Sequence, residues 1–175
     1  MKKITEIAHD LLLEKKGNCA IDFTCGNGFD TYFLAQHFNC VYAFDIQASA
    51  IENTRERCSD YTNVHCILDS HANIKQYVSG FNAGIFNCGY LPHGDTTITT
   101  EADSVIKALN EALTILEKEG RIVVVLYPGF EAGEKEAMLV EDYLSSLSGK
   151  HYDVYKQVVL NRNKVPYIIC IDKKI

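Results

Sequence analysis

The chain has 175 residues, 47% of them apolar and 23% charged, which suits one globular domain with a substantial core. No run of about 18 uncharged apolar residues occurs, so the composition argues against a membrane-spanning helix. The net charge of −6 argues against a large non-specific nucleic-acid surface, although it leaves room for a local basic patch.

The first residues show an amphipathic pattern that predicts a helix over residues 4–15. They lack the long apolar stretch and small-residue cleavage site of a signal peptide, so we expect a cytoplasmic protein. Further along, runs of strand length alternate with helical periodicity. We predict strands at about 19–23, 40–45, 63–68, 83–87, 120–127, 152–160 and 166–172, and further helices at about 29–37, 47–58, 101–118 and 132–147.

This alternation of strands and helices predicts right-handed crossovers and a mostly parallel sheet. The nearly continuous apolar run over residues 121–126 is typical of a strand covered on both faces. Before it, Glu119-Gly120 is expected to end a helix, with the glycine just past its last turn. No helix separates the last two strands, and Asn161 to Lys164 resembles a hairpin turn. We therefore predict one domain over residues 1–175, an α/β, Rossmann-like class I methyltransferase fold: a seven-stranded, mostly parallel sheet with helices on both faces and an antiparallel C-terminal hairpin.

Seven cysteines are present, without a C-x-x-C pair, and several lie in apolar runs. We interpret them as small buried hydrophobic residues and predict neither a zinc site nor a disulfide framework. Basic residues gather near the two ends of the chain. They are Lys2, Lys3, Lys15, Lys16, Lys150, Lys156, Arg162, Lys164, Lys173 and Lys174. They form either a solvated mixed-charge surface or a local basic patch.

The segment from Asp22 to Thr31 is a glycine-rich turn between a strand and a helix, where backbone can approach a ligand closely. A carboxylate ends the strand, which disfavours a phosphate ligand and favours one with positive charge and hydroxyls, such as S-adenosylmethionine (SAM). We expect Asp22 and Asp30 to face its ammonium and Gly26 and Gly28 to admit its backbone. The dinucleotide-binding pattern G-x-G-x-x-G would need its third glycine at the position of Thr31, so this spacing disfavours a dinucleotide-binding fold.

Two further loops follow the second and third predicted strands. Asp45 can accept hydrogen bonds from the two ribose hydroxyls, or it can serve only as a cap for the next helix. Asp69 and Ser70 can bind the adenine amine and ring nitrogens, or they too can act as caps alone. His71 can stack on or bond to the cofactor, although a lone histidine is more often structural.

A fourth loop, Phe86 to Asp95, follows the strand at 83–87. An amide oxygen and a backbone carbonyl there can accept N–H bonds and direct a nitrogen lone pair at a methyl group. The candidate catalytic residues are Asn87, Tyr90 and Asp95. Asn87 would orient the nitrogen together with the Cys88 carbonyl, and Asp95 would relay a proton or only cap the next segment. Holding such a geometry can lower the barrier by roughly 7–11 kcal/mol.

These segments together resemble a family of small bacterial methylases first labelled rRNA methylases. Its pattern D-A-T-x-G-N-G-x-D-T is matched from Asp22 to Thr31, F-D-I-Q from Phe44 to Gln47, and F-N-x-G-Y-L-P-x-G-D from Phe86 to Asp95. The resemblance implies SAM-dependent conversion of 5-aminomethyl-2-thiouridine at the tRNA wobble position to its 5-methylaminomethyl form, and hence contact with the anticodon stem-loop. With this substrate, Tyr90 would pack on the base. It implies a cofactor site of Asp22, Thr24, Gly26, Asn27, Gly28, Asp30, Thr31, Asp45, Ile46, Gln47, Asp69, Ser70, His71 and Asn87.

The chain departs from the family pattern where the substrate should enter. Phe130 replaces a histidine, Ala132 replaces a glycine, and His93 occupies a position often held by glycine. Alternatives are a small-molecule methyltransferase, which fits the acidic charge better, and a SAM-binding protein without catalysis. A homodimer could supply basic surface that one subunit lacks, but no residue requires it.

Overall fold

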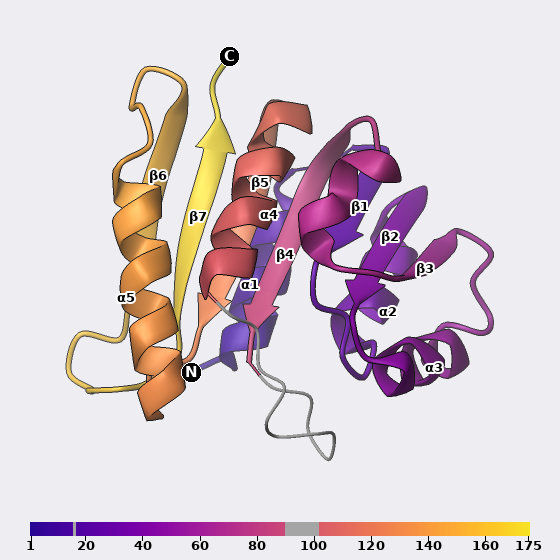
Figure 1. Cartoon of the computed structure of the whole chain (residues 1–175), viewed down its shortest axis with the longest axis horizontal. Coiled ribbons are helices and arrows are strands. Elements are labelled where there is room, and N and C mark those ends of the chain that lie inside the picture. Colours follow the sequence, from indigo (N-terminus) through magenta and orange to yellow (C-terminus); the bar gives the residue numbers. More distant parts are fainter. Residues whose placement is uncertain (16, 90–101) are drawn as a thin grey trace.

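The computed structural model describes residues 1–15, 17–89 and 102–175. Its helices and strands alternate as the sequence predicts (Figure 1). The helices are α1 (Ile4–Leu13), α2 (Phe29–His37), α3 (Ala48–Arg57), α4 (Ala102–Ile115) and α5 (Glu131–Ser145), with a short 3-10 segment η1 (His71–Gln76). The strands are β1 (Cys19–Asp22), β2 (Cys40–Asp45), β3 (Val64–Leu68), β4 (Phe81–Cys88), β5 (Leu116–Leu126), β6 (Tyr152–Gln157) and β7 (Tyr167–Lys173).

The seven strands form one sheet in the order β3-β2-β1-β4-β5-β7-β6. Strands β1 to β5 pair in parallel, while β7 pairs antiparallel with both β5 and β6. The predicted fold, including its C-terminal hairpin, is therefore confirmed. The order of the strands along the sheet reverses between β1 and β4, and the crevice that ligands use in open α/β sheets lies outside the carboxyl ends of the strands at such a point.

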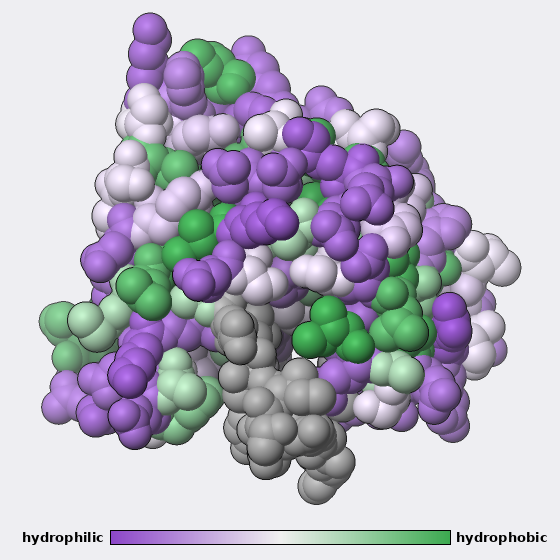
Figure 2. All heavy atoms as spheres, viewed as in Figure 1, coloured by the Kyte–Doolittle hydropathy of each residue, from purple (hydrophilic) through white to green (hydrophobic). Residues whose placement is uncertain are grey.

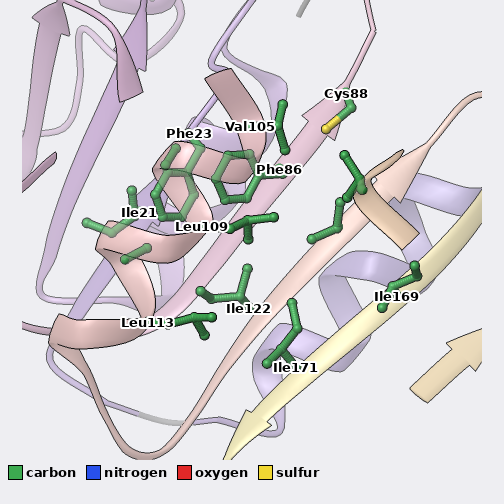
Figure 3. Packing of buried hydrophobic residues seen from close by; sticks show 14 of the residues in the cluster. Ile21, Phe23, Phe86, Cys88, Val105, Leu109, Leu113, Ile122, Ile169 and Ile171 are labelled. Carbon is green, nitrogen blue, oxygen red and sulfur yellow. The ribbon is translucent and has the colours of Figure 1, made fainter. Parts of the chain in front are cut away.

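Helices cover both faces of the sheet, and each face has its own apolar cluster. On one side Ala8 and Leu12 of α1 and Leu34 of α2 belong to one apolar cluster with Val123 and Val125 of β5. On the other side α4 and α5 cover Phe86 and Ile122, and the rings of Phe23 and Phe86 stack with centroids 3.9 Å apart (Figure 3). Residues Ile122 to Leu126 are fully buried, as expected of a central strand. Cys25, Cys58, Cys88 and Cys170 are buried as well.

Three details differ from the sequence-based expectation. Helix α4 ends at Ile115, and Leu116 already pairs with Phe81 of β4 across a register shift. Gly120 therefore does not cap a helix. It is buried against β4, where a Cβ would lie 2.9 Å from the Asn82 carbonyl oxygen. The residue with the left-handed backbone conformation is Glu119. Strand β6 ends at Gln157 rather than at residue 160, because the chain leaves the sheet and exposes Leu160.

Within the described ranges, no helix combines the length and apolar character needed to cross a membrane. Figure 2 shows small apolar patches scattered among polar residues on the face that carries α4 and α5.

Candidate active site

A cleft of about 1210 Å³ lies at the carboxyl edge of the parallel strands. This volume exceeds the range of about 300–1,000 Å³ that is usual for a single small-ligand site. Of the residues predicted from sequence, the structure brings eleven to its wall: Thr24, Gly26, Asn27, Asp30, Asp45, Ile46, Gln47, Asp69, Ser70, His71 and Asn87. Tyr90 and Asp95, the other two candidate catalytic residues, lie outside the described residues, as does His93.

The glycine-rich turn after β1 is held by its own polar groups. Gly28 adopts a φ of 83°, and a Cβ there would lie 2.8 Å from the Thr54 Cα, so only glycine fits. Asp22 is fully buried beneath the turn and accepts hydrogen bonds from the Thr31 hydroxyl at 2.6 Å and the Thr24 amide at 3.2 Å. Burial, reinforced by the neighbouring Asp30, raises the pKa of Asp22 to about 8.

This position corrects one expectation from the sequence. Asp22, Gly28 and Thr31 do not line the cleft, because Asp22 ends a central strand covered on both faces and its side chain turns under the loop. Asp22 therefore shapes the turn from below, and Asp30 is the carboxylate of this segment that reaches the cleft.

Asp45 links the first two loops. One carboxylate oxygen accepts the Gly26 amide at 3.1 Å, and the other accepts the Gln47 amide at 3.0 Å. The N-cap position of α3 is occupied by Gln47 and not by Asp45, so capping of α3 does not account for Asp45. Its half-buried carboxylate lines the cleft and retains acceptor capacity for a pair of hydroxyls.

The third loop combines capping with a place on the cleft wall. The Asp69 carboxylate accepts the Tyr77 hydroxyl at 2.6 Å, together with the Ser70 amide and the Asn73 side chain, and these bonds lower the pKa of Asp69. Ser70 caps η1 by accepting the Ala72 amide at 3.2 Å. Both side chains also line the cleft, so the capping role and the ligand role are compatible.

His71 already has a partner for each ring nitrogen. Its Nδ1 lies 2.8 Å from the Phe23 carbonyl oxygen and its Nε2 lies 3.1 Å from the Ser104 hydroxyl. Burial lowers the pKa of His71, which favours the neutral ring. Because the carbonyl can only accept, Nδ1 donates and Nε2 accepts from the hydroxyl. The ring can therefore contribute a surface to the cleft, while its hydrogen bonds serve the fold.

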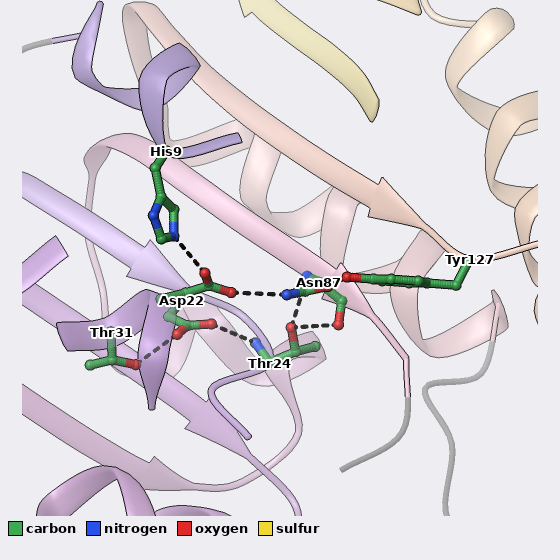
Figure 4. A network of polar contacts seen from close by, with 7 residues as sticks. His9, Asp22, Thr24, Thr31, Asn87 and Tyr127 are labelled. Atoms are coloured by element: carbon green, nitrogen blue, oxygen red, sulfur yellow. Dashed lines mark hydrogen bonds and ion pairs between the residues drawn. The ribbon is translucent and has the colours of Figure 1, made fainter. Parts of the chain in front are cut away.

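Asn87 lies at the centre of a chain of polar contacts that crosses the cleft floor (Figure 4). Its amide nitrogen donates to Asp30 at 3.1 Å, and its oxygen accepts the Tyr127 hydroxyl at 2.5 Å. The other Asp30 oxygen lies 2.6 Å from Nε2 of His9. A carboxylate only accepts, so the amide orientation is determined. The pKa of Tyr127 is raised to about 12, chiefly by burial, which keeps the hydroxyl a donor at neutral pH.

Sequence reasoning missed His9, Tyr127 and other lining residues. Tyr127 follows β5 at the same edge of the sheet as the four predicted loops, so the rule that located those loops could have found it. His9 comes from α1, and its only sequence signal is a place on an amphipathic helix. The other lining residues that were missed include Lys3, Thr5, Glu6, Phe29, Ser104, Gly129, Lys164 and Pro166. Phe130, which the sequence analysis placed where the substrate should enter, also lines the cleft.

The donor set suits SAM. Asp30, Asp45 and Asp69 offer carboxylates for an ammonium, a ribose diol and an adenine amine, and the glycine turn offers close backbone approach. Among the described lining residues, the lysines come from the start of α1 and from the β6–β7 connection, and none comes from the turn itself. A phosphate-binding loop would place a cation or unpaired amides there. The sheet order and this acidic edge define a class I methyltransferase.

Comparison with known proteins gives the family. The model of the family described as "Putative rRNA methylase" matches residues 41–173. A curated relative from Arabidopsis thaliana, tRNA (mnm(5)s(2)U34)-methyltransferase, chloroplastic, is 33% identical over 99% of this chain and 70% of its own length. The chain belongs to this methylase family and is a SAM-dependent methyltransferase.

Solved structures agree. A structure from Clostridium thermocellum named a putative rRNA-methylase superposes with a TM-score of 0.94 at 37% identity, covering 99% of this chain and 98% of its own. A methyltransferase structure from Streptococcus mutans in complex with S-adenosylhomocysteine (SAH) gives a TM-score of 0.90 at 36% identity, with 99% of each chain covered.

Proposed function

We propose that this protein N-methylates 5-aminomethyl-2-thiouridine at the wobble position of tRNA, producing the 5-methylaminomethyl form. The observation that carries the proposal is the oriented amide of Asn87 on the cleft floor, next to a carboxylate-lined half that fits SAM. The substrate is inferred from the curated relative, whose name specifies the methylated product, mnm(5)s(2)U34, and which matches nearly the whole chain.

In this proposal one half of the cleft, the cofactor half with Asp30, Asp45 and Asp69, binds SAM, and the other half, around Asn87, binds the acceptor amine. Asp30 holds the ammonium of SAM, Asp45 its ribose hydroxyls, and Asp69 its adenine amine. SAM supplies a methyl group on a sulfonium. The Asn87 side-chain oxygen and the Cys88 carbonyl accept the N–H bonds of the acceptor amine, which directs the nitrogen lone pair inward. Removal of water from the amine favours its neutral, reactive form.

The roles of Tyr90 as a packing surface and Asp95 as a proton carrier stay predictions. We further propose that residues 1–175 form one domain that acts in the cytoplasm on the anticodon stem-loop. A homodimer would add basic surface to a chain of net charge −6. Contact with RNA phosphates should weaken as salt rises.

The test uses labelled SAM and tRNA that carries the aminomethyl group, followed by identification of the labelled nucleoside. The proposal requires label in 5-methylaminomethyl-2-thiouridine and none in tRNA that lacks the aminomethyl group. Asn87→Ala should lose most of the single-turnover rate. Label in a metabolite pool would favour the small-molecule alternative, and bound SAM without any labelled product would favour the non-catalytic one.

A further inference from the structure

The cleft extends beyond the polar floor along a wall that leads outward from Asn87. Tyr127 touches Asn87 through its hydroxyl, and Phe130 follows three residues later at the start of α5. Phe130 lines the cleft and is 38% exposed, while Tyr127 is largely covered. Both aromatic residues therefore line the same cleft, and Phe130 is the more exposed of the two.

The ring of Phe130 lies against the first turn of α5. A Cβ on Gly133 would lie 2.7 Å from the Phe130 Cε1, so the ring lies directly over that glycine. The Phe130 carbonyl also accepts the Glu134 amide at 2.9 Å. The aromatic ring therefore packs on the first turn of α5 and is still partly exposed.

Two lysines line the same cleft as this ring. Lys164, in the β6–β7 connection, lines the same cleft and forms an exposed ion pair with Glu134 at 3.6 Å. A Cβ on Gly129 would lie 3.2 Å from the Lys164 carbonyl oxygen, so the two loops are in close contact. Lys3, at the start of α1, lines the cleft as well. A partly exposed aromatic ring in a cleft that is also lined by lysines is the combination with which proteins bind the bases and phosphates of single-stranded nucleic acid.

We propose that Phe130 is a specificity-determining residue on which the base next to the modified nucleotide stacks. The inference rests on the proposed function, since it takes RNA as the substrate, and it adds a contact that the acceptor nucleoside alone would lack. Lys164 and Lys3 would then lie beside the phosphates of the same strand.

The test is a double-mutant cycle on RNA affinity, measured with the SAH-loaded protein so that turnover plays no part. Wild type and Phe130→Ala are titrated with an anticodon stem-loop that carries the aminomethyl nucleoside, and with versions in which either neighbouring nucleotide is abasic. Phe130→Ala should weaken binding of the intact RNA by about 5- to 150-fold. The wild-type protein should bind one of the two abasic RNAs as weakly as Phe130→Ala binds the intact RNA. Phe130→Ala should bind that abasic RNA with the same affinity as the wild type does.

Two controls separate stacking from other causes. Phe130→Tyr keeps the ring and should keep the affinity, whereas Leu139→Ala removes an exposed apolar side chain of α5 outside the cleft and should have no effect. SAH affinity should be unchanged in every variant, which reports an intact fold. Equal binding of intact RNA by wild type and Phe130→Ala, additive losses with both abasic RNAs, or a matching loss in Leu139→Ala would overturn the inference.

Methyl transfer measured in parallel distinguishes the two proposals. Transfer that proceeds without any effect of Phe130→Ala contradicts only the stacking inference. Coupled binding without methyl transfer contradicts only the proposed function. A wild-type protein that does not bind the stem-loop contradicts both.

Discussion

The hydroxyl of Tyr127 offers a direct test of how the transfer site is built, because it touches the Asn87 amide without belonging to the proposed cofactor half. In Tyr127→Phe the amide keeps its bond to Asp30 at 3.1 Å but loses the donor that fixes its oxygen. A net intramolecular hydrogen bond contributes about 0.5–1.5 kcal/mol to stability. Water from the cleft can replace the hydroxyl, so we expect the free energy of unfolding to fall by about 1 kcal/mol.

The catalytic cost should be larger than the cost in stability. Removing a donor that contacts the transition state directly costs about 10²–10³ in kcat. Tyr127 acts through Asn87, so we expect a smaller loss of single-turnover rate, about 10- to 100-fold, or about 1.4–2.8 kcal/mol in the barrier. Because the pKa of Tyr127 is near 12, the ratio of wild-type to variant rates should stay constant between pH 7 and 9.

The assay is rapid-quench methyl transfer with saturating SAM, beside calorimetric titration of SAH. The matched control is Tyr167→Phe, which removes a hydroxyl bonded to Glu141 at 2.7 Å, outside the cleft. This control should lose some stability and no rate. An unchanged rate in Tyr127→Phe, or a rate loss fully explained by weaker SAH binding, would refute the orienting role of the Asn87 amide.

Three further predictions concern the cofactor half and the rim. Asp45→Asn should weaken SAH binding at least about tenfold, because hydrogen bonds to charged groups contribute about 1.5–3 kcal/mol; calorimetry with undiminished affinity would contradict this. Asp22 has a folded-state pKa of about 8 against an ordinary 3.8, so the folded protein holds that proton more tightly than the unfolded chain and loses stability as pH rises from about 4 to 8. Asp22→Asn cannot ionise and should gain stability relative to wild type across that window in urea unfolding at pH 5 and pH 8; a pH-independent difference would rule this out. Lys164→Gln should reduce the salt dependence of RNA binding by about one unit of slope, while Lys135→Gln, on the exposed side of α5, should leave it unchanged.

Much of the candidate site follows from one rule that sequence can apply. Parallel strands end at a common edge, so the polar residues after β1, β2, β3 and β4 had to meet there. Asp45 and Asn87 lie there as expected. The same rule could not decide which way Asp22 turns, because the last residue of a short strand can face the cleft or the layer below it. In this fold the Thr31 hydroxyl and the Thr24 amide hold it below.

The helix boundary before β5 shows a different limit. The periodicity from Ile106 through Leu116 favours helix beyond residue 115, and a glycine after Glu119 is typical of a helix end. Pairing of Leu116 with Phe81 is a contact between distant segments, and it prevails over the local preference. Gly120 is required for close packing against β4 instead, which no local pattern distinguishes from a cap.

The polar chain on the cleft floor could not be read from spacing at all. Its members His9, Asp30, Asn87 and Tyr127 come from α1, α2, β4 and the end of β5. Each is an ordinary residue in its own segment, and only the docking of α1 on the sheet brings His9 to Asp30. Since the Asn87 amide is held by partners from two other elements, its orientation is set by the packing of the whole domain. The reactivity of this site should therefore be sensitive to changes at the α1–sheet interface that touch no ligand, because a shift of α1 releases Asp30 and, through it, the amide.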